Sequence, residues 1–514
     1  MSERNFYITT PIYYVNDVPH IGHTYTSIAV DTLARYKKMC GYDAFMLTGT
    51  DEHGQKIANA AETTGLKPIE LADKVNVHFR NLIKTINADI KGFVRTTDER
   101  HADVVQAVFK KMQDAGDIYL GEYEGWYCTP CEAFWTETQL GEEHLCPDCG
   151  GKTIMAKEPT YFFKMSKYQD RLLKHIEDNP RFIMPEYRKN EVVSFIKEGL
   201  KDLSVSRTSL TWGVPVPGNE KHVIYVWIDA LISYISGLGY SMADDKDFNK
   251  YWSSAFHMVG KDIVRFHTVY WPTMLMSIGI EPPKTVFAHG WWTVEGKKMS
   301  KRLGNVVEPF KLIEDYGVDA VRYFLLREVS FGLDGDFSFK ALKGRINSDL
   351  ANDLGNLLSR SLGMVNRYFG GILPDAGEAT APEREIQKLI ADTAREYHEH
   401  FNEVAFNKVL TSVWALIGRL NKYVDEMQPW VLAKDESKHA RLGTVLYTLA
   451  DSLRVLSHMV SPFMPDSAVK MRRQLNISEN VALADEQALA ETGLLKSGVK
   501  IGELVALFPR IEDK

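Results

Sequence analysis

The sequence predicts an α/β fold in which a parallel sheet is split by an insert and followed by an all-helical domain. The first observation is a strand, helix, strand pattern close to the N-terminus. Residues 5–14 are aromatic and β-branched, as expected of a buried strand, and residues 43–48 have the same character. Between them, one helical face carries Ile21, Tyr25, Ile28, Leu33 and Tyr36. A βαβ unit of this length implies a parallel sheet.

The second observation is a different residue pattern between positions 118 and 217. Short aromatic runs, turns and cysteine pairs replace the α/β pattern there. Strand-like segments return at residues 222–229, 255–260 and 285–292. Asp262 can cap a helix behind the second of these segments. The α/β domain is therefore expected in two halves that flank an insert.

The third observation is the helical spacing of apolar residues from Leu342 to about Pro465, with a glycine and proline break at residues 370–382. The sequence contains no internal repeat and no low-complexity tract. We expect an α/β domain in two halves at 1–117 and 218–292, an insert at 118–217, a basic-loop region at 293–341, a helical domain at 342–466 and a tail that packs back on the body at 467–514.

The composition excludes a largely disordered chain, a fibrous repeat protein and a membrane bundle. Hydrophobic residues make up 45% and charged residues 25% of the chain, the mix of an ordinary globular protein. No segment has the roughly 18 uninterrupted apolar residues that a membrane helix needs, and the N-terminus has no apolar signal core. We therefore expect a cytoplasmic protein with reduced cysteines and no membrane contact. Because the net charge is −7, any contact with nucleic acid must come from local basic patches.

Four of the five cysteines form two C-x-x-C pairs, Cys128 with Cys131 and Cys146 with Cys149. Four thiolates complete a tetrahedral zinc shell, and a closed shell of this kind is structural. Free core cysteines are a poor alternative for two pairs in so short a stretch. A redox pair is also disfavoured, because neither pair opens a helix after a strand. The sequence thus predicts one structural zinc ion.

Two further motifs suit a phosphate ligand. His20 and His23 stand where the first strand meets its helix, so both imidazoles can donate to a phosphate oxygen at a helix N-terminus, and Gly22 leaves room for a nucleotide. Lys298 and Lys301 belong to a basic loop whose ammonium groups suit a polyphosphate. Taken alone, each motif has a simpler explanation. The histidine pair can be a helix cap, and the lysines can belong to a solvated basic loop.

Together these motifs resemble those of the class I aminoacyl-tRNA synthetases, which combine a histidine motif at the first βα turn with a KMSK loop after the last strand. Five further segments narrow the resemblance to the methionyl-tRNA synthetase family: residues 10–16 (TPIYYVN), 51–54 (DEHG), 225–230 (YVWIDA), 260–263 (GKDI) and 429–430 (PW). The resemblance covers nearly the whole chain. It departs from the family pattern at Arg302, where the signature often has serine.

The resemblance implies a Rossmann-type sheet, a zinc-knuckle insert, a stem-contact region at 293–341 and an anticodon-binding helical bundle. It implies that L-methionine and ATP, with Mg²⁺, form methionyl adenylate and pyrophosphate. The methionyl group then passes to the 3′ adenosine of tRNA(Met), and the sequence does not distinguish initiator from elongator tRNA. The implied methionine pocket consists of Ile12, Tyr14, Asp51, Trp227, Ala230, Leu231, Tyr234 and His267.

Roles within the site follow from the same resemblance. Asp51 is expected to hold the substrate ammonium, and either the Tyr14 hydroxyl or His267 to test for the sulfur. The ATP-binding residues that the resemblance implies are Asn16, His20, Gly22, His23, Gly260, Asp262 and Lys301. The implied catalytic residues are His20, His23, Lys298, Lys301, Lys261 and Arg207.

Anticodon recognition is expected of Asn356, Arg360 and Trp430. Asn356 and Arg360 are four residues apart and so share a helix face, and Trp430 lies at a helix break where an indole can be exposed. Stacking on aromatic rings and hydrogen bonds to base edges are how single-stranded loop bases are recognised. Without the resemblance, a tryptophan in the core of the bundle would be the simpler explanation.

Other functions fit parts of the sequence. The synthetases for leucine, isoleucine and valine carry an editing domain that is too large for residues 118–217, and a cysteine-specific relative would hold a metal inside its pocket. A silent tRNA-binding protein would be expected to have lost a signature histidine or lysine. A nucleotidyltransferase unrelated to tRNA would not need the helical domain. A monomer is expected, because the chain stops at Lys514 without the dimerising domain that some relatives carry.

Overall fold

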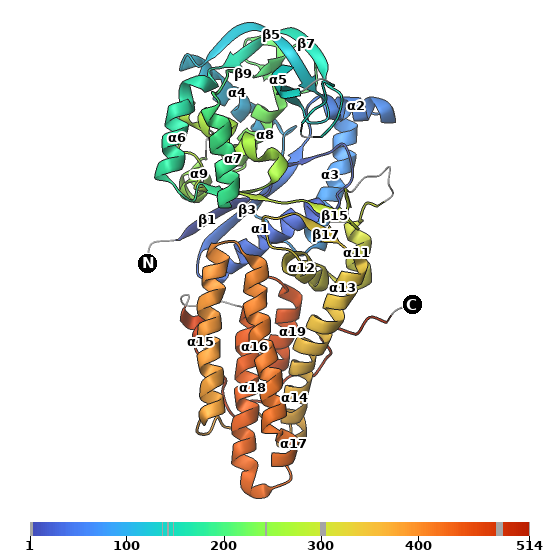
Figure 1. Cartoon of the computed structure of the whole chain (residues 1–514), viewed down its shortest axis with the longest axis vertical. Helices are drawn as coiled ribbons and strands as arrows, with labels where there is room; N and C mark the ends of the chain where they lie inside the picture. Colours follow the sequence, from blue (N-terminus) through green and yellow to red (C-terminus); the bar gives the residue numbers. More distant parts are fainter. Residues whose placement is uncertain are drawn as a thin grey trace.

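The computed structural model describes residues 4–135, 137–140, 143–147, 149–241, 244–298, 305–479 and 487–512. Figure 1 shows an elongated molecule in which an α/β body lies above a bundle of long helices. This arrangement confirms the predicted fold class. Within the described ranges, no helix combines the length and the apolar character needed to cross a membrane.

A seven-stranded sheet forms the centre of the body, and all its described pairings are parallel. The strand order is β2-β3-β1-β13-β14-β8, with β4 beside β3. The strands are β1 (Asn5–Thr9), β2 (Tyr13–Tyr14), β3 (Asp43–Asp51), β4 (Gly92–Arg95), β8 (Ile183–Met184), β13 (Phe256–Gly260) and β14 (Thr285–His289). The helices that follow its first strands are α1 (Ile21–Met39), α2 (Gln55–Thr64), α3 (Pro68–Thr85) and α4 (Glu99–Asp114). Strand β1 therefore has neighbours on both sides, and open sheets bind ligands beyond the carboxyl ends of such strands.

Two strand predictions were wrong in detail. Residues 5–14 form two strands, because Pro11 has no N–H for the ladder between them. Residues 222–229 end the antiparallel strand β12 (Asn219–Ile224) and begin helix α8 (Val226–Ser236). All residues of α8 are buried, so no polar face reveals its period, and the run resembles a buried strand.

Two further expectations need correction. The segment 285–292 is divided at Gly290, where a Cβ atom would lie 2.3 Å from the backbone of Leu333. Asp262 lies within a 3₁₀ turn (Lys261–Ile263) and not at a helix cap, because its carboxylate accepts a hydrogen bond from the Trp291 indole. The turn leads into a π-helical segment, Phe266–Tyr270, and then α10 (Trp271–Ser277).

The insert forms an antiparallel sheet, whose long ribbon of β5 and β7 lies at the top of Figure 1. One short strand of the insert, β8, nevertheless pairs with β14 in the central sheet. The strands of the insert and its border are β5 (Ile118–Cys128), β6 (Ala133–Trp135), β7 (Ile154–Phe163), β9 (Leu203–Ser204), β10 (Ser206–Arg207) and β11 (Pro215–Val216). Its helices are α5 (Glu137–Leu140), α6 (Gln169–Asp178) and α7 (Glu186–Lys197).

Beyond the central sheet the chain enters a small three-stranded sheet and then the bundle. The small sheet contains β15 (Trp292–Val294), β16 (Lys297–Lys298) and β17 (Gly335–Phe337). The remaining helices are α9 (Lys246–Tyr251), α11 (Pro309–Tyr316), α12 (Val318–Arg327), α13 (Phe339–Arg345), α14 (Asn356–Phe369), α15 (Ala381–Asn402), α16 (Phe406–Met427), α17 (Pro429–Leu432), α18 (His439–Met459) and α19 (Pro465–Leu475). A π-helical stretch, Ile346–Gly355, connects α13 to α14. The tail contacts α18 of the bundle, where the Asp451 carboxylate accepts the backbone N–H groups of residues 493–495.

A buried ion pair joins the body to the bundle. Asp31 on α1 and Arg322 on α12 are both fully buried, with a nitrogen–oxygen distance of 2.6 Å. The Arg322 guanidinium also donates to the carbonyls of Ile86, Pro462 and Phe463. Burial alone would raise the pKa of Asp31, but Arg322 and Arg35 outweigh it and lower that pKa. One guanidinium thus ties α1, the end of α3 and the loop before α19 together.

We predict that Arg322→Met lowers the free energy of unfolding by about 3–5 kcal/mol, because three buried carbonyls lose their donor and the buried Asp31 carboxylate keeps only one of its two arginine partners. Because the Asp31 pKa is lowered on folding, the contribution of the pair is present at neutral pH and is lost as the pH falls through that lowered pKa. Thermal melting at pH 7 measures the effect. Arg395→Met is the control, since Arg395 forms an exposed pair with Asp392 that contributes under about 1 kcal/mol. Equal melting temperatures for the two variants would contradict the assignment.

Candidate functional site

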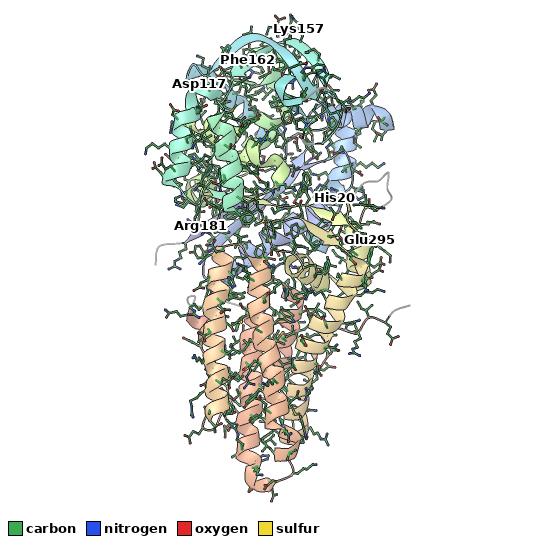
Figure 2. The ribbon with its side chains drawn as sticks, viewed as in Figure 1. His20, Asp117, Lys157, Phe162, Arg181 and Glu295 are labelled. Atoms are coloured by element: carbon green, nitrogen blue, oxygen red, sulfur yellow. The ribbon has the colours of Figure 1, made fainter. Side chains whose placement is uncertain are left out.

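A cavity of about 800 Å³ opens at the carboxyl ends of β1 and β13. Figure 2 places His20, one of its lining residues, near the junction of the body and the bundle. Fourteen of the predicted residues line this cavity: Ile12, Tyr14, Asn16, His20, Gly22, His23, Asp51, Trp227, Ala230, Leu231, Tyr234, Gly260, Asp262 and His267. The structure therefore brings together residues from four separate parts of the sequence.

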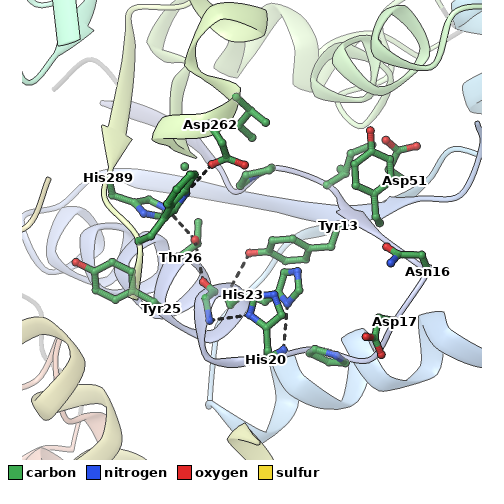
Figure 3. Close-up of a pocket in the computed structure, with 18 of the residues that line it drawn as sticks. Tyr13, Asn16, Asp17, His20, His23, Tyr25, Thr26, Asp51, Asp262 and His289 are labelled. Carbon is green, nitrogen blue, oxygen red and sulfur yellow. Dashed lines mark hydrogen bonds between the residues drawn. The ribbon is translucent and has the colours of Figure 1, made fainter. Parts of the chain in front are cut away.

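The two histidine rings lie side by side at the first turn of α1, with centroids 4.0 Å apart and planes tilted by 36° (Figure 3). The Nδ1 atom of His20 accepts the N–H of Gly22 at 3.0 Å, and Nδ1 of His23 accepts the N–H of His20 at 3.1 Å. Burial lowers the pKa of both imidazoles. Each neutral ring therefore carries its proton on Nε2, and both Nε2–H groups can donate to an anion. Gly22 is required here, because a Cβ would lie 2.8 Å from the His20 ring.

Three polar atoms at the other end of the cavity are buried and, among the described residues, have no hydrogen-bond partner. They are Oδ1 of Asp51, the hydroxyl of Tyr14 and Nε1 of Trp227. Burial raises the pKa of Asp51 well above its usual value, and the nearby carboxylates of Asp229 and Glu132 raise it further. A buried carboxylate with like charges around it favours a cationic ligand. These atoms suit a small ligand that has an ammonium group beside an apolar part.

His267 is not available to contact a ligand through its ring nitrogens. Its Nδ1 lies 2.9 Å from the Ile263 carbonyl and its Nε2 lies 2.7 Å from the Tyr234 hydroxyl. Nδ1 must donate to the carbonyl, so Nε2 accepts from Tyr234. Burial lowers the pKa of His267 to about 4, so the ring is neutral. Of the two groups that the sequence offered as a sulfur probe, only the Tyr14 hydroxyl is unpartnered in the described structure.

Gly260 and Asp262 form the edge of the cavity after β13. The Asp262 carboxylate accepts the indole N–H of Trp291 at 3.0 Å. Lys261 does not line the cavity; its ammonium pairs with Asp334 at 2.6 Å and lies 4.3 Å from the centre of the Trp291 ring. Lys261 thus contacts a cavity wall from outside.

Of the remaining predicted catalytic residues, only Arg207 has a described side chain. Arg207 is buried, is not among the lining residues of the cavity, donates to the Ser204 hydroxyl at 3.0 Å and lies 4.7 Å from the centre of the Tyr225 ring. Lys298 contributes its backbone to β16, and nothing further is described of it. Lys301 lies outside the described residues.

Several cavity residues were not predicted from the sequence. Lys56 on α2 places a cation in the lining, and Trp291 forms part of the rim with 36% of its surface exposed. His289 at the end of β14 bonds to Thr26 of α1 at 2.8 Å (Figure 3). The only signal for these residues was their position after a strand, which many residues share.

The four predicted zinc ligands come together in the insert. Their sulfur atoms all lie within 4.8 Å of one another, with 3.6 Å between Cys128 and Cys149 and 3.9 Å between Cys131 and Cys146. A tetrahedron with metal–sulfur bonds of about 2.3 Å has edges of about 3.8 Å, so the cluster fits a metal ion. The four sulfurs would fill a tetrahedral shell, as a structural site requires.

Glu132, next to Cys131, connects this cluster to the cavity. Its side chain accepts the backbone N–H of Lys56 at 2.7 Å, and its carbonyl accepts the hydroxyl of Tyr225, which directly precedes α8. Burial raises the pKa of Glu132 to about 7. The cluster therefore supports two cavity walls, the first turn of α2 and the start of α8.

A second candidate surface lies on the bundle. Asn356 and Arg360 share one face of α14, and the Arg360 guanidinium lies 5.9 Å from the centre of the Trp430 ring. Trp430 is 38% exposed at the break between α16 and α17, so it is not a core residue. Arg360 also pairs with Asp425 at 2.8 Å.

Comparison with known proteins agrees with this geometry. Residues 6–153 and 142–362 match the family "tRNA synthetases class I (M)", and residues 373–514 match the "anticodon binding domain of methionyl tRNA ligase". The methionine–tRNA ligase of Caldanaerobacter subterraneus is 52% identical over 510 residues, which cover 99% of this chain and 79% of that protein. The Bacillus subtilis enzyme is 49% identical over 521 residues, covering 99% and 78%.

Solved structures give the same result. Mycobacterium tuberculosis methionyl-tRNA synthetase in complex with methionyl-adenylate superposes with a TM-score of 0.94 at 43% identity, covering 99% of this chain and 100% of that one. The apo form of that enzyme gives a TM-score of 0.88 at 40% identity, covering 100% and 99%.

We predict that Cys146→Ser abolishes stoichiometric metal binding and loosens the insert, because metal binding energy in such a knuckle is folding energy. Because Glu132 accepts a backbone N–H of α2, amide hydrogen exchange should rise in the first turn of α2 as well as near the cysteines. Metal analysis and hydrogen-exchange mass spectrometry measure the two effects. Cys40→Ala is the control, because Cys40 lies outside the cluster and its loss should leave the metal in place. A metal-free protein with unchanged exchange would refute the structural role.

Proposed function

The chain belongs to the methionine–tRNA ligase family of class I synthetases, and we propose how its cavity performs the reaction of that family. The enzyme activates L-methionine with ATP and then transfers the methionyl group to tRNA. The observation that carries the proposal is a set of buried atoms on Tyr14, Asp51 and Trp227 that have no hydrogen-bond partner in the described part of the chain. These atoms lie in one cavity with His20 and His23.

Methionine binds at the end of the cavity that holds Asp51. The Asp51 carboxylate accepts the substrate ammonium, which supplies the cation that this buried group needs. The Tyr14 hydroxyl donates to the thioether sulfur. An apolar and aromatic wall surrounds the methyl thioether, formed by Ile12, Trp227, Ala230, Leu231, Tyr234 and His267. Trp227 is held rigidly by stacking on Phe266 at 3.7 Å.

ATP binds at the end of the cavity that holds the histidines. Asn16 and the Nε2–H groups of His20 and His23 donate to its phosphates, and Gly260 and Asp262 contact the ribose. ATP enters with Mg²⁺, which offsets part of the phosphate charge. Lys298 and Lys301 stabilise the departing pyrophosphate. Lys261 positions Trp291, and Arg207 supports the wall behind the cavity through Tyr225.

The reaction needs no protein nucleophile. A carboxylate oxygen of methionine attacks the α-phosphorus, the bond to the bridging oxygen of the β-phosphate breaks, and pyrophosphate leaves with that electron pair. The 3′-terminal adenosine of tRNA then attacks the methionyl carbonyl, and AMP leaves. Catalysis consists of positioning and charge stabilisation.

The proposal extends to the metal, the tRNA and the assembly. The ion of the four-cysteine cluster is zinc, since four thiolates at these distances are its common structural shell. Asn356, Arg360 and Trp430 bind the anticodon of both initiator and elongator tRNA(Met), because a half-exposed indole beside a guanidinium offers stacking and hydrogen bonds together. The enzyme acts as a monomer, which light scattering can test.

We predict that Trp430→Ala lowers kcat/KM for tRNA charging by about five- to a hundredfold, the effect of losing one stacked base. Methionine-dependent exchange of pyrophosphate into ATP should be unchanged, because the adenylate forms in the other domain. Val431→Ala is the matched control, since it shortens an equally exposed side chain on the same helix and should affect neither reaction. A parallel loss of both reactions in Trp430→Ala, with a lower melting temperature, would assign Trp430 to folding. Absence of exchange in the unaltered enzyme would refute the proposed activity itself.

A further inference from the structure

Lys56 is a cavity residue without an assigned role. It is the only lysine or arginine among the described residues that line the cavity. No carboxylate of the described chain lies within ion-pair distance of its ammonium. The ammonium lies over the face of the Tyr14 ring, 4.5 Å from the ring centre. Both substrates carry anionic groups, while His20 and His23 are neutral donors. A cation at this place is therefore suited to an anion that the cavity receives.

The backbone beneath Lys56 is held in place from the insert. Glu132 accepts the Lys56 N–H at 2.7 Å at the first turn of α2. Gly54 permits this contact, because it has φ +97° and a Cβ there would lie 2.5 Å from a Glu132 carboxylate oxygen. The root of the Lys56 side chain is thus fixed.

Lys56 interacts with both halves of the site. Its ammonium lies over the Tyr14 ring, which belongs to the methionine end. At the histidine end, the pKa of His23 is lowered by burial first, then by His20 and by the charge of Lys56. The carboxylate of methionine and the α-phosphate of ATP must meet between these two ends of the cavity for the adenylate to form.

We propose that Lys56 is a further substrate-binding residue, whose ammonium contacts an anionic oxygen where the amino-acid carboxylate meets the α-phosphate. The inference rests on the proposed function of the cavity. The anionic oxygen can belong either to the amino-acid carboxylate or to the phosphate. Ligands that lack one of these two groups show which of them Lys56 contacts.

The experiment compares the unaltered enzyme with Lys56→Met, which keeps the length of the side chain and removes its charge, and with Lys56→Arg, which restores the charge. Calorimetry measures the affinity for L-methionine and for L-methioninol, which has a hydroxymethyl group in place of the carboxylate. Pyrophosphate exchange gives kcat and KM for ATP. Lys74→Met is the matched control, because Lys74 is exposed on α3 and loses the same charge.

If Lys56 binds the carboxylate, Lys56→Met weakens methionine binding about tenfold or more and leaves methioninol binding unchanged. If it binds the phosphate, methionine affinity is kept while kcat/KM for ATP falls by a similar factor. In both cases Lys56→Arg recovers part of the loss and Lys74→Met is unaffected. Equal losses for methionine and methioninol, or no loss in any measurement, would show that Lys56 only covers Tyr14 and would overturn the inference. Failure of the unaltered enzyme to bind methionine would refute the proposed function instead.

Discussion

The parallel pairing of β1 with β3 on one side and β13 on the other is the constraint on which the rest of the structure depends. Asn5 to Thr9 pair in register with Asp43 to Leu47, and Ile8 and Thr9 pair with Phe256 and His257. Because all three strands run the same way, their carboxyl ends open at one edge of the sheet. The two histidines, Asp51 and Gly260 meet only for this reason. A slip of one residue would turn each side chain of a strand to the opposite face.

The cavity combines groups that are costly to bury with supports that keep them in place. Asp51 and Tyr14 bury polar atoms without a hydrogen-bond partner in the described structure, a state that costs stability. Asp229, beneath the pocket, is instead fully paired with His53 at 2.7 Å and His101 at 2.8 Å. Asp229 is therefore a structural charge with its own partners, whereas Asp51 and Tyr14 have polar atoms that a ligand can pair. Residues outside the cavity also hold its walls in place. Glu132 on the insert accepts the backbone N–H of Lys56, and Arg322 pairs with Asp31 on α1.

The sequence predicted the fold class, the four cysteines and fourteen of the residues that line the cavity, because these depend on local patterns and on recognisable motifs. It failed at α8, where full burial removes the polar face that distinguishes a helix from a strand. It could not show that the His267 ring bonds to Tyr234, or that Glu132 reaches Lys56, because these contacts join segments that are far apart in the sequence. Residues 299–304, which contain Lys301, lie outside the described chain, so the expected role of that residue stays a prediction.

Asp51 binds a proton readily in the free cavity and, on the proposed function, becomes the carboxylate partner of the substrate ammonium. Burial and neighbouring carboxylates raise its pKa in the free protein, and a bound ammonium must lower it again, so methionine binding should release a proton from the protein. Calorimetry of methionine binding in buffers of different ionisation enthalpy, between about pH 5 and pH 7, measures that proton directly. Net proton release is expected at any pH below the raised pKa of the free protein and above the lowered pKa of the complex, and it should be lost in Asp51→Asn. Tight methionine binding by Asp51→Asn with the same proton release as the unaltered enzyme would contradict it.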